Sequence, residues 1–124
     1  MKKDLFLILV GIILISLDRI TKLSFGNSKN YGFLFGILKN NIFFCVLTII
    51  ILLFLIYFYI SKKDIYLKIS LIFIISGVLS NLIDRLYLGY VIDFINLGFW
   101  PSFNLADIYN IMGVIFFLTQ IKKW

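Results

Sequence analysis

The chain has 124 residues, of which 62% are hydrophobic, and its mean hydropathy is +1.06. This composition excludes a large soluble domain and is typical of a protein that crosses a membrane several times. All six acidic residues are aspartate, the net charge is +6, and the chain has no histidine, which excludes Ser-His and Cys-His nucleophile pairs and most zinc sites.

Long apolar runs predict an all-α membrane protein with four transmembrane helices. The predicted helices cover residues 5–23, 41–60, 66–84 and 105–121 of a single transmembrane domain, residues 1–124. The first run has a basic start, but no small-residue cleavage site follows it, so we interpret it as a retained helix and not a signal peptide. The second run is the clearest, because residues 42–60 carry no charge.

The basic residues predict the orientation of these helices. Seven lysines lie at the two ends of the chain and in the turn at 61–68, namely Lys2, Lys3, Lys62, Lys63, Lys68, Lys122 and Lys123. The other five basic residues are Arg19, Lys22, Lys29, Lys39 and Arg85. Because positively charged segments stay on the cytoplasmic side, we expect both termini in the cytoplasm. Basic residues that occur singly or in pairs at helix ends indicate membrane lipid, and no nucleic acid, as the partner.

Four aspartates lie near the ends of the apolar runs. Asp18, Asp84 and Asp107 are each 14 to 16 residues from the charged cytoplasmic end of their helix. At roughly 1.5 Å per residue this is about 21–24 Å, within the outer third of a hydrocarbon core of about 30 Å. Asp93 follows Asp84 by nine residues, and Gly89 allows the chain to turn back to the same depth. Charged groups near hydrocarbon are costly and indicate function.

The third predicted helix has a polar face. Gly77, Asn81, Asp84 and Arg85 occur at positions i, i+4, i+7 and i+8, which lie on one side of a helix. We expect this side to point into the bundle, while the leucine, isoleucine and phenylalanine side chains face lipid.

Asp93 and Asp107 are the candidates for a catalytic pair, because neither has a basic residue close by in the sequence. Two carboxylates held close together share one proton. One can then take a proton from water while the other polarises a carbonyl and later protonates the leaving amine. Such a pair hydrolyses a peptide bond without a metal, a cofactor or a covalent intermediate.

Structural roles remain open for the other polar residues. Asp18 and Lys22 are four residues apart and can form a salt bridge at the end of the first helix. Asp84 can form an interfacial charge pair with its neighbour Arg85. Asn104 can cap the fourth helix, since asparagine side chains accept hydrogen bonds from the first N–H groups of a helix.

Several short motifs occur in order along nearly the whole chain. Residues 18–22 match D-x-x-T-K, and residues 30–36 match N-x-G-x-x-F. Residues 81–94 match N-x-x-D-R…G-x-V-x-D-F, and residues 103–107 match F-N-x-A-D. Each motif is short, but the ordered set is specific, and it resembles that of the lipoprotein signal peptidase (signal peptidase II) family.

The resemblance implies a monomeric four-helix aspartic endopeptidase of the bacterial cytoplasmic membrane with its active site toward the outer face. It would cut prolipoproteins just before the diacylglyceryl-modified cysteine, with no cofactor and no metal. By motif position, the catalytic pair is Asp93 and Asp107, the contacts to substrate or supports of the pair are Asn30, Asn81, Arg85 and Asn104, and the structural supports are Asp18, Lys22 and Asp84.

The outer segment of this chain is short. Only 11 residues separate Asp18 from Asn30, where the family usually has a longer segment that forms a small sheet beneath the substrate. We therefore expect this extracytoplasmic sheet to be reduced or absent.

Two other functions remain open from the sequence. Four spans in a small basic chain also describe a proton-coupled membrane transporter, although its carboxylate would be expected in the middle of the first helix. A non-enzymatic membrane adaptor, whose aspartates only pair with lysine and arginine, predicts that Asp93→Asn leaves activity unchanged.

Overall fold

The four predicted helices are present in the computed structural model, which describes residues 2–31 and 41–121. Their boundaries differ from the predicted ones by at most four residues. Residues 32–36 of the second motif, and the predicted cytoplasmic Lys122 and Lys123, lie outside the described residues, as does Lys39. In chain order the elements are α1 (Lys2–Phe25), β1 (Ser28–Asn30), α2 (Asn41–Ser61), α3 (Ile65–Leu88), β2 (Val91–Asp93) and α4 (Leu105–Ile121).

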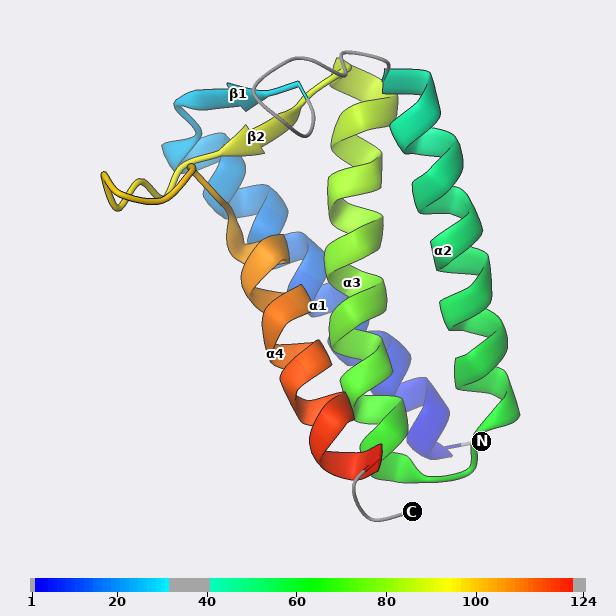
Figure 1. The fold of residues 1–124 in the computed structure, drawn as a ribbon. Coiled ribbons are helices and arrows are strands. Elements are labelled where there is room, and N and C mark those ends of the chain that lie inside the picture. The colour runs from blue at the N-terminus through cyan, green and yellow to red at the C-terminus, as the bar shows by residue number, and fades with distance from the viewer. Residues whose placement is uncertain (1, 32–40, 122–124) are drawn as a thin grey trace.

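α3 is the central helix of the bundle, and α1, α2 and α4 pack around it (Figure 1). α1 also contacts α4, and these two helices cover the polar face of α3: Asn81 and Asp84 contact α1, and Gly77 lies against α4. The start of α1, the turn between α2 and α3 and the end of α4 lie at one end of the bundle (Figure 1). The two strands lie at the opposite end.

The outer surface of the bundle is apolar. α2 and α3 are each long and apolar enough to cross a membrane, and α4 is a shorter apolar helix of 17 residues. α2 exposes large side chains along its length, such as Ile42, Leu53 and Phe54. An apolar surface of this extent is stable against lipid and not against water.

Glycines allow α3 and α4 to approach closely. A Cβ atom at Gly77 of α3 would lie 2.4 Å from the carbonyl oxygen of Ala106. A Cβ atom at Gly113 of α4 would lie 2.8 Å from the carbonyl oxygen of Ser70. Because backbone atoms cannot move aside as a flexible side chain can, the contact between these helices requires small residues at both positions.

Local capping determines where α3 begins and ends. The Asp64 side chain accepts a hydrogen bond from the Leu67 N–H at 2.8 Å, which caps the start of the helix. α3 runs one turn beyond the predicted end, to Gly89, whose positive φ of 79° is easily adopted only by glycine. The chain reverses there, as predicted, and enters β2.

β1 and β2 form a two-stranded antiparallel sheet, with Ser28 opposite Asp93 and Asn30 opposite Val91. Each strand has three residues. Within the described residues the expected sheet is therefore present but small, and it carries Asp93 at the end of β2.

Candidate active site

A buried lysine lies at the centre of the polar cluster. The Lys22 side chain is fully buried, and its Nζ lies 2.7 Å from Asp18 Oδ2 and 2.9 Å from Asp84 Oδ2. Nζ also donates a hydrogen bond to Asn81 Oδ1 at 3.0 Å. An ammonium group has three N–H donors, so all of them are used. The predicted Asp18–Lys22 salt bridge is confirmed.

Asp84 pairs with α1 and not with its neighbour in the sequence, so the suggested Asp84–Arg85 pair is wrong. Asp84 Oδ1 lies 2.6 Å from Arg19 Nη2, and Oδ2 accepts from both Lys22 and the Ile92 N–H. Consecutive residues of a helix point in different directions, whereas α1 packs directly against α3. Arg19 was not identified from the sequence; its only signal was its place beside Asp18 at the end of an apolar run.

Asp18 connects three helices. Its Oδ1 accepts a hydrogen bond from the Ala106 N–H at the start of α4, at 3.0 Å, and its Oδ2 accepts from the Ser80 hydroxyl of α3. Together with its ion pair to Lys22, these contacts use both carboxylate oxygens. Asp18 and Asp84 are therefore both ion-paired, and their two negative charges balance the two positive charges of Lys22 and Arg19.

Asp107 lies in the first turn of α4 and is held by a reciprocal cap. Its backbone N–H donates to Asn104 Oδ1 at 3.0 Å, while its Oδ2 accepts from the Asn104 N–H at 3.1 Å. Its Oδ1 accepts from Asn81 Nδ2 at 3.0 Å. The predicted cap by Asn104 is confirmed, and it orients the Asp107 side chain as well as the helix.

Asp93 lies at the end of β2 and is 1% exposed. Its Oδ1 accepts from Asn104 Nδ2 at 2.9 Å, and its Oδ2 accepts from Asn30 Nδ2 at 3.2 Å. Burial raises the pKa of Asp93 to about 6, the Asn30 hydrogen bond opposes the rise, and the nearby Asp107 carboxylate adds to it. Asp93 therefore changes protonation state close to neutral pH.

Asn104 brings the two candidate carboxylates together. Its backbone N–H contacts Asp107 and its side-chain amide contacts Asp93, so both acids are bound to one residue. The same amide also lies within hydrogen-bond distance of Asn81 Oδ1, at 3.1 Å, and of the Ile92 carbonyl oxygen, at 3.2 Å. Among the described residues, no lysine or arginine forms an ion pair with either acid.

The structure thus gathers eight of the nine predicted site residues in one connected network. The ninth, Arg85, lies half-buried in the last turn of α3. Across the described ranges, no group of three or more aspartate or cysteine side chains is placed to hold a metal ion. The eight connected residues are Asp18, Lys22, Asn30, Asn81, Asp84, Asp93, Asn104 and Asp107.

The fold and the site define a helical membrane protein that presents two carboxylates at one end of its bundle. Residues 9–123 match the family described as signal peptidase (SPase) II. The chain accordingly belongs to the lipoprotein signal peptidase (signal peptidase II) family, whose members are peptidases of bacterial membranes.

Individual relatives agree with this assignment. The chain is 35% identical to a lipoprotein signal peptidase of Clostridium novyi (strain NT), over 90% of this chain and 92% of the relative. It is 40% identical to that of Halothermothrix orenii, over 77% of this chain and 69% of the relative. The alignment with the C. novyi protein spans 139 residues, more than the 124 of this chain, so that relative has additional residues within the aligned region.

Two solved structures, both described as bacterial membrane enzymes, have the same fold. One gives a TM-score of 0.83 at 29% identity and covers 95% of this chain and 88% of its own. The other gives a TM-score of 0.84 at 30% identity and covers 94% and 92%. The similarity therefore extends over the whole arrangement of helices and strands.

Proposed function

We propose that this chain is an aspartic endopeptidase that removes signal peptides from diacylglyceryl-modified prolipoproteins, cutting just before the lipid-modified cysteine. The proposal depends on one observation above all: Asp93 and Asp107 are bound to the same residue, Asn104, and neither is neutralised by a cation among the described residues. The other two acids at this end, Asp18 and Asp84, are ion-paired and serve as supports.

The chemistry follows from a pair that holds one proton. The ionised carboxyl takes a proton from water as the water oxygen attacks the scissile carbonyl carbon. The protonated carboxyl donates to the carbonyl oxygen, so a neutral tetrahedral intermediate forms. The carboxyl that took the proton from water then donates it to the amide nitrogen, while the other carboxylate takes a proton from one hydroxyl of the intermediate. The C–N bond breaks, an acid and an amine are released, and the pair is back in its initial singly protonated state. The pKa of Asp93, about 6, suits this exchange near neutral pH.

The asparagines position the acids for this reaction. Asn81 accepts from Lys22 and donates to Asp107, so the buried ammonium group orients the amide that holds one catalytic carboxylate. Asn104 and Asn30 each donate to one oxygen of Asp93. Because a carboxylate oxygen has two lone pairs, each oxygen retains one for water or substrate.

We further propose that the chain is one transmembrane domain with four membrane-crossing helices, active as a monomer in the bacterial cytoplasmic membrane. Both termini face the cytoplasm and the carboxylate pair faces outward. The charge distribution supports this orientation, because Lys2, Lys3 and Lys63, at the far end of the bundle, have no acidic partner in the part of the chain that the structure describes. At the carboxylate end, Arg19 and Lys22 are neutralised by buried aspartates.

Cleavage of a lipid-modified prolipoprotein tests the catalytic assignment. The purified protein in detergent or lipid is incubated with this substrate, and loss of the signal peptide is followed by gel shift. We expect Asp93→Asn and Asp107→Asn each to abolish cleavage while the protein stays folded. Asp64→Asn is the matched control, because Asp64 caps α3 far from the pair and asparagine caps as well as aspartate.

Cleavage that survives either substitution in the pair would refute the assignment of that residue. Absence of cleavage by the unsubstituted protein would instead reject the proposed substrate. Proton transport would then be measured, to test the transporter alternative. Membership of the peptidase family already favours cleavage over the transporter alternative.

A further inference from the structure

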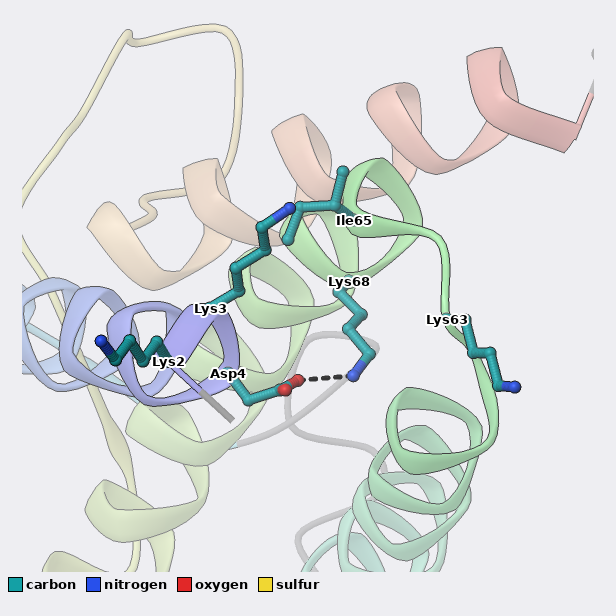
Figure 2. A pocket seen from close by; sticks show the side chains of 6 residues that line it. All are labelled: Lys2, Lys3, Asp4, Lys63, Ile65 and Lys68. Atoms are coloured by element: carbon teal, nitrogen blue, oxygen red, sulfur yellow. Dashed lines mark hydrogen bonds and ion pairs between the residues drawn. The ribbon is translucent and has the colours of Figure 1, made fainter.

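A second polar site lies at the opposite end of the bundle from the carboxylate pair. A cavity of about 460 Å³ opens between the start of α1 and the start of α3 (Figure 2). Figure 2 shows Lys3 reaching toward Ile65, while Lys2 and Lys63 extend away from the cavity in different directions. The cavity is lined by Lys2, Lys3, Asp4, Lys63, Ile65 and Lys68.

The lining carries excess positive charge. Lys68 forms an ion pair and a hydrogen bond with Asp4, and the Tyr59 hydroxyl donates to the same carboxylate at 3.3 Å. Lys2, Lys3 and Lys63 have no acidic partner among the described residues. Four lysines and one aspartate give the lining a net charge of +3. The Lys3 ammonium group beside Ile65, together with the excess positive charge of the lining, favours an anion.

An apolar cavity adjoins the basic one. Its volume is about 320 Å³, and it shares Lys2, Lys3 and Ile65 with the basic cavity. Its remaining walls are the side chains of Phe6, Leu7 and Ile69, which face the region between α1 and α3. A ligand that fills both cavities has an anionic group beside the lysines and a hydrocarbon chain against the helices.

We propose that these two cavities bind one anionic phospholipid of the inner leaflet, with its phosphate beside the Lys3 ammonium group and an acyl chain along Phe6, Leu7 and Ile69. The adjoining apolar cavity favours a lipid over a soluble phosphate, and the net charge of the lining favours an anionic over a zwitterionic headgroup. The inference rests on the proposed orientation of the bundle in the membrane, but not on peptide cleavage.

Lipid retention by the purified protein tests this site independently of activity. The protein in detergent is titrated with phosphatidylglycerol or phosphatidylcholine of identical chains, and bound lipid is counted by native mass spectrometry. We expect phosphatidylglycerol to bind more tightly, and Lys3→Gln to weaken it about 5-fold, as one lysine at a membrane surface does. Lys62→Gln is the matched control, because Lys62 lies between α2 and α3 at the same end of the bundle but outside the cavity lining, with its ammonium over the Phe58 ring.

A second variant tests the apolar cavity. Ile69→Phe reduces its volume and is expected to weaken phosphatidylglycerol binding without changing the weak binding of glycerol phosphate. Circular dichroism checks that each variant remains folded. Equal binding of the two lipids, an equal effect of Lys3→Gln and Lys62→Gln, or glycerol phosphate binding as tightly as the lipid would each overturn the proposal. Cleavage activity is measured separately, so the lipid-binding result can be interpreted even if the protein does not cleave the prolipoprotein.

Discussion

Replacing Lys22 with methionine tests whether the buried charges hold α1 against α3 and α4. Methionine keeps most of the apolar stem but removes two ion pairs, at 2.7 and 2.9 Å, and one hydrogen bond. Asp84 retains Arg19 at 2.6 Å, whereas Asp18 loses its only cation among the described residues. Leaving one buried charge uncompensated costs about 3–5 kcal/mol, so we expect the free energy of unfolding to fall by this amount.

Unfolding of the purified protein in detergent micelles by increasing dodecyl sulfate, followed by circular dichroism, measures this loss. The double variant Lys22→Met/Asp18→Asn removes the uncompensated charge and keeps an acceptor for the Ala106 N–H, so we expect it to recover at least about 1 kcal/mol. Lys29→Met is the control. Lys29 is exposed and its ammonium group lies over the Tyr90 ring, so loss of this side chain should cost about 1 kcal/mol or less.

Two results would refute this reasoning. A loss below about 1 kcal/mol for Lys22→Met would show that the network contributes little to folding, as surface ion pairs do. A double variant no more stable than the single one would show that an uncompensated charge on Asp18 is not the cause of the loss.

Three further measurements test the site and its packing. Asn104→Ala should lower cleavage about 10²-fold, by loss of an oriented donor, and should cost about 1 kcal/mol as a lost cap. Asn104→Ser, which can still cap α4, should lower cleavage without that loss of stability; full activity would contradict the proposed contact with Asp93. The pKa of Asp93 is about 6 in the folded state and 3.8 in the unfolded state, so the folded state holds the proton more tightly. The free energy of unfolding should therefore fall as pH rises from about 3.8 to about 6, by at most about 3 kcal/mol. Asp93→Asn should remove that part of the pH dependence, and an unchanged profile would contradict the raised pKa. Gly77→Ala places a Cβ 2.4 Å from the Ala106 carbonyl oxygen and should lower the free energy of unfolding by about 1–3 kcal/mol, measured in the same titration; unchanged stability would contradict the close contact of α3 and α4.

The sequence alone predicted the helices and eight residues of the polar network around Asp93 and Asp107. A short chain made of long apolar runs cannot bury them all in a soluble fold. In lipid such runs form helices, because a helix satisfies its own backbone hydrogen bonds. Local spacing was sufficient to predict the Asp18–Lys22 ion pair, whose residues are four apart on α1, and the cap of α4 by Asn104. These features depend on residues that are close together in the chain.

Contacts between distant segments required the tertiary structure. Asp84 adjoins Arg85 in the sequence but pairs with Arg19 and Lys22, because packing of α3 on α1 decides which cations reach it. The pairing of β1 with β2 likewise brings Asn30 to Asp93 across 63 positions of the chain. Apolar periodicity determines which face of a helix is buried, but the partner of a buried charge depends on the rotation and depth of the neighbouring helix, and these are properties of the packed bundle.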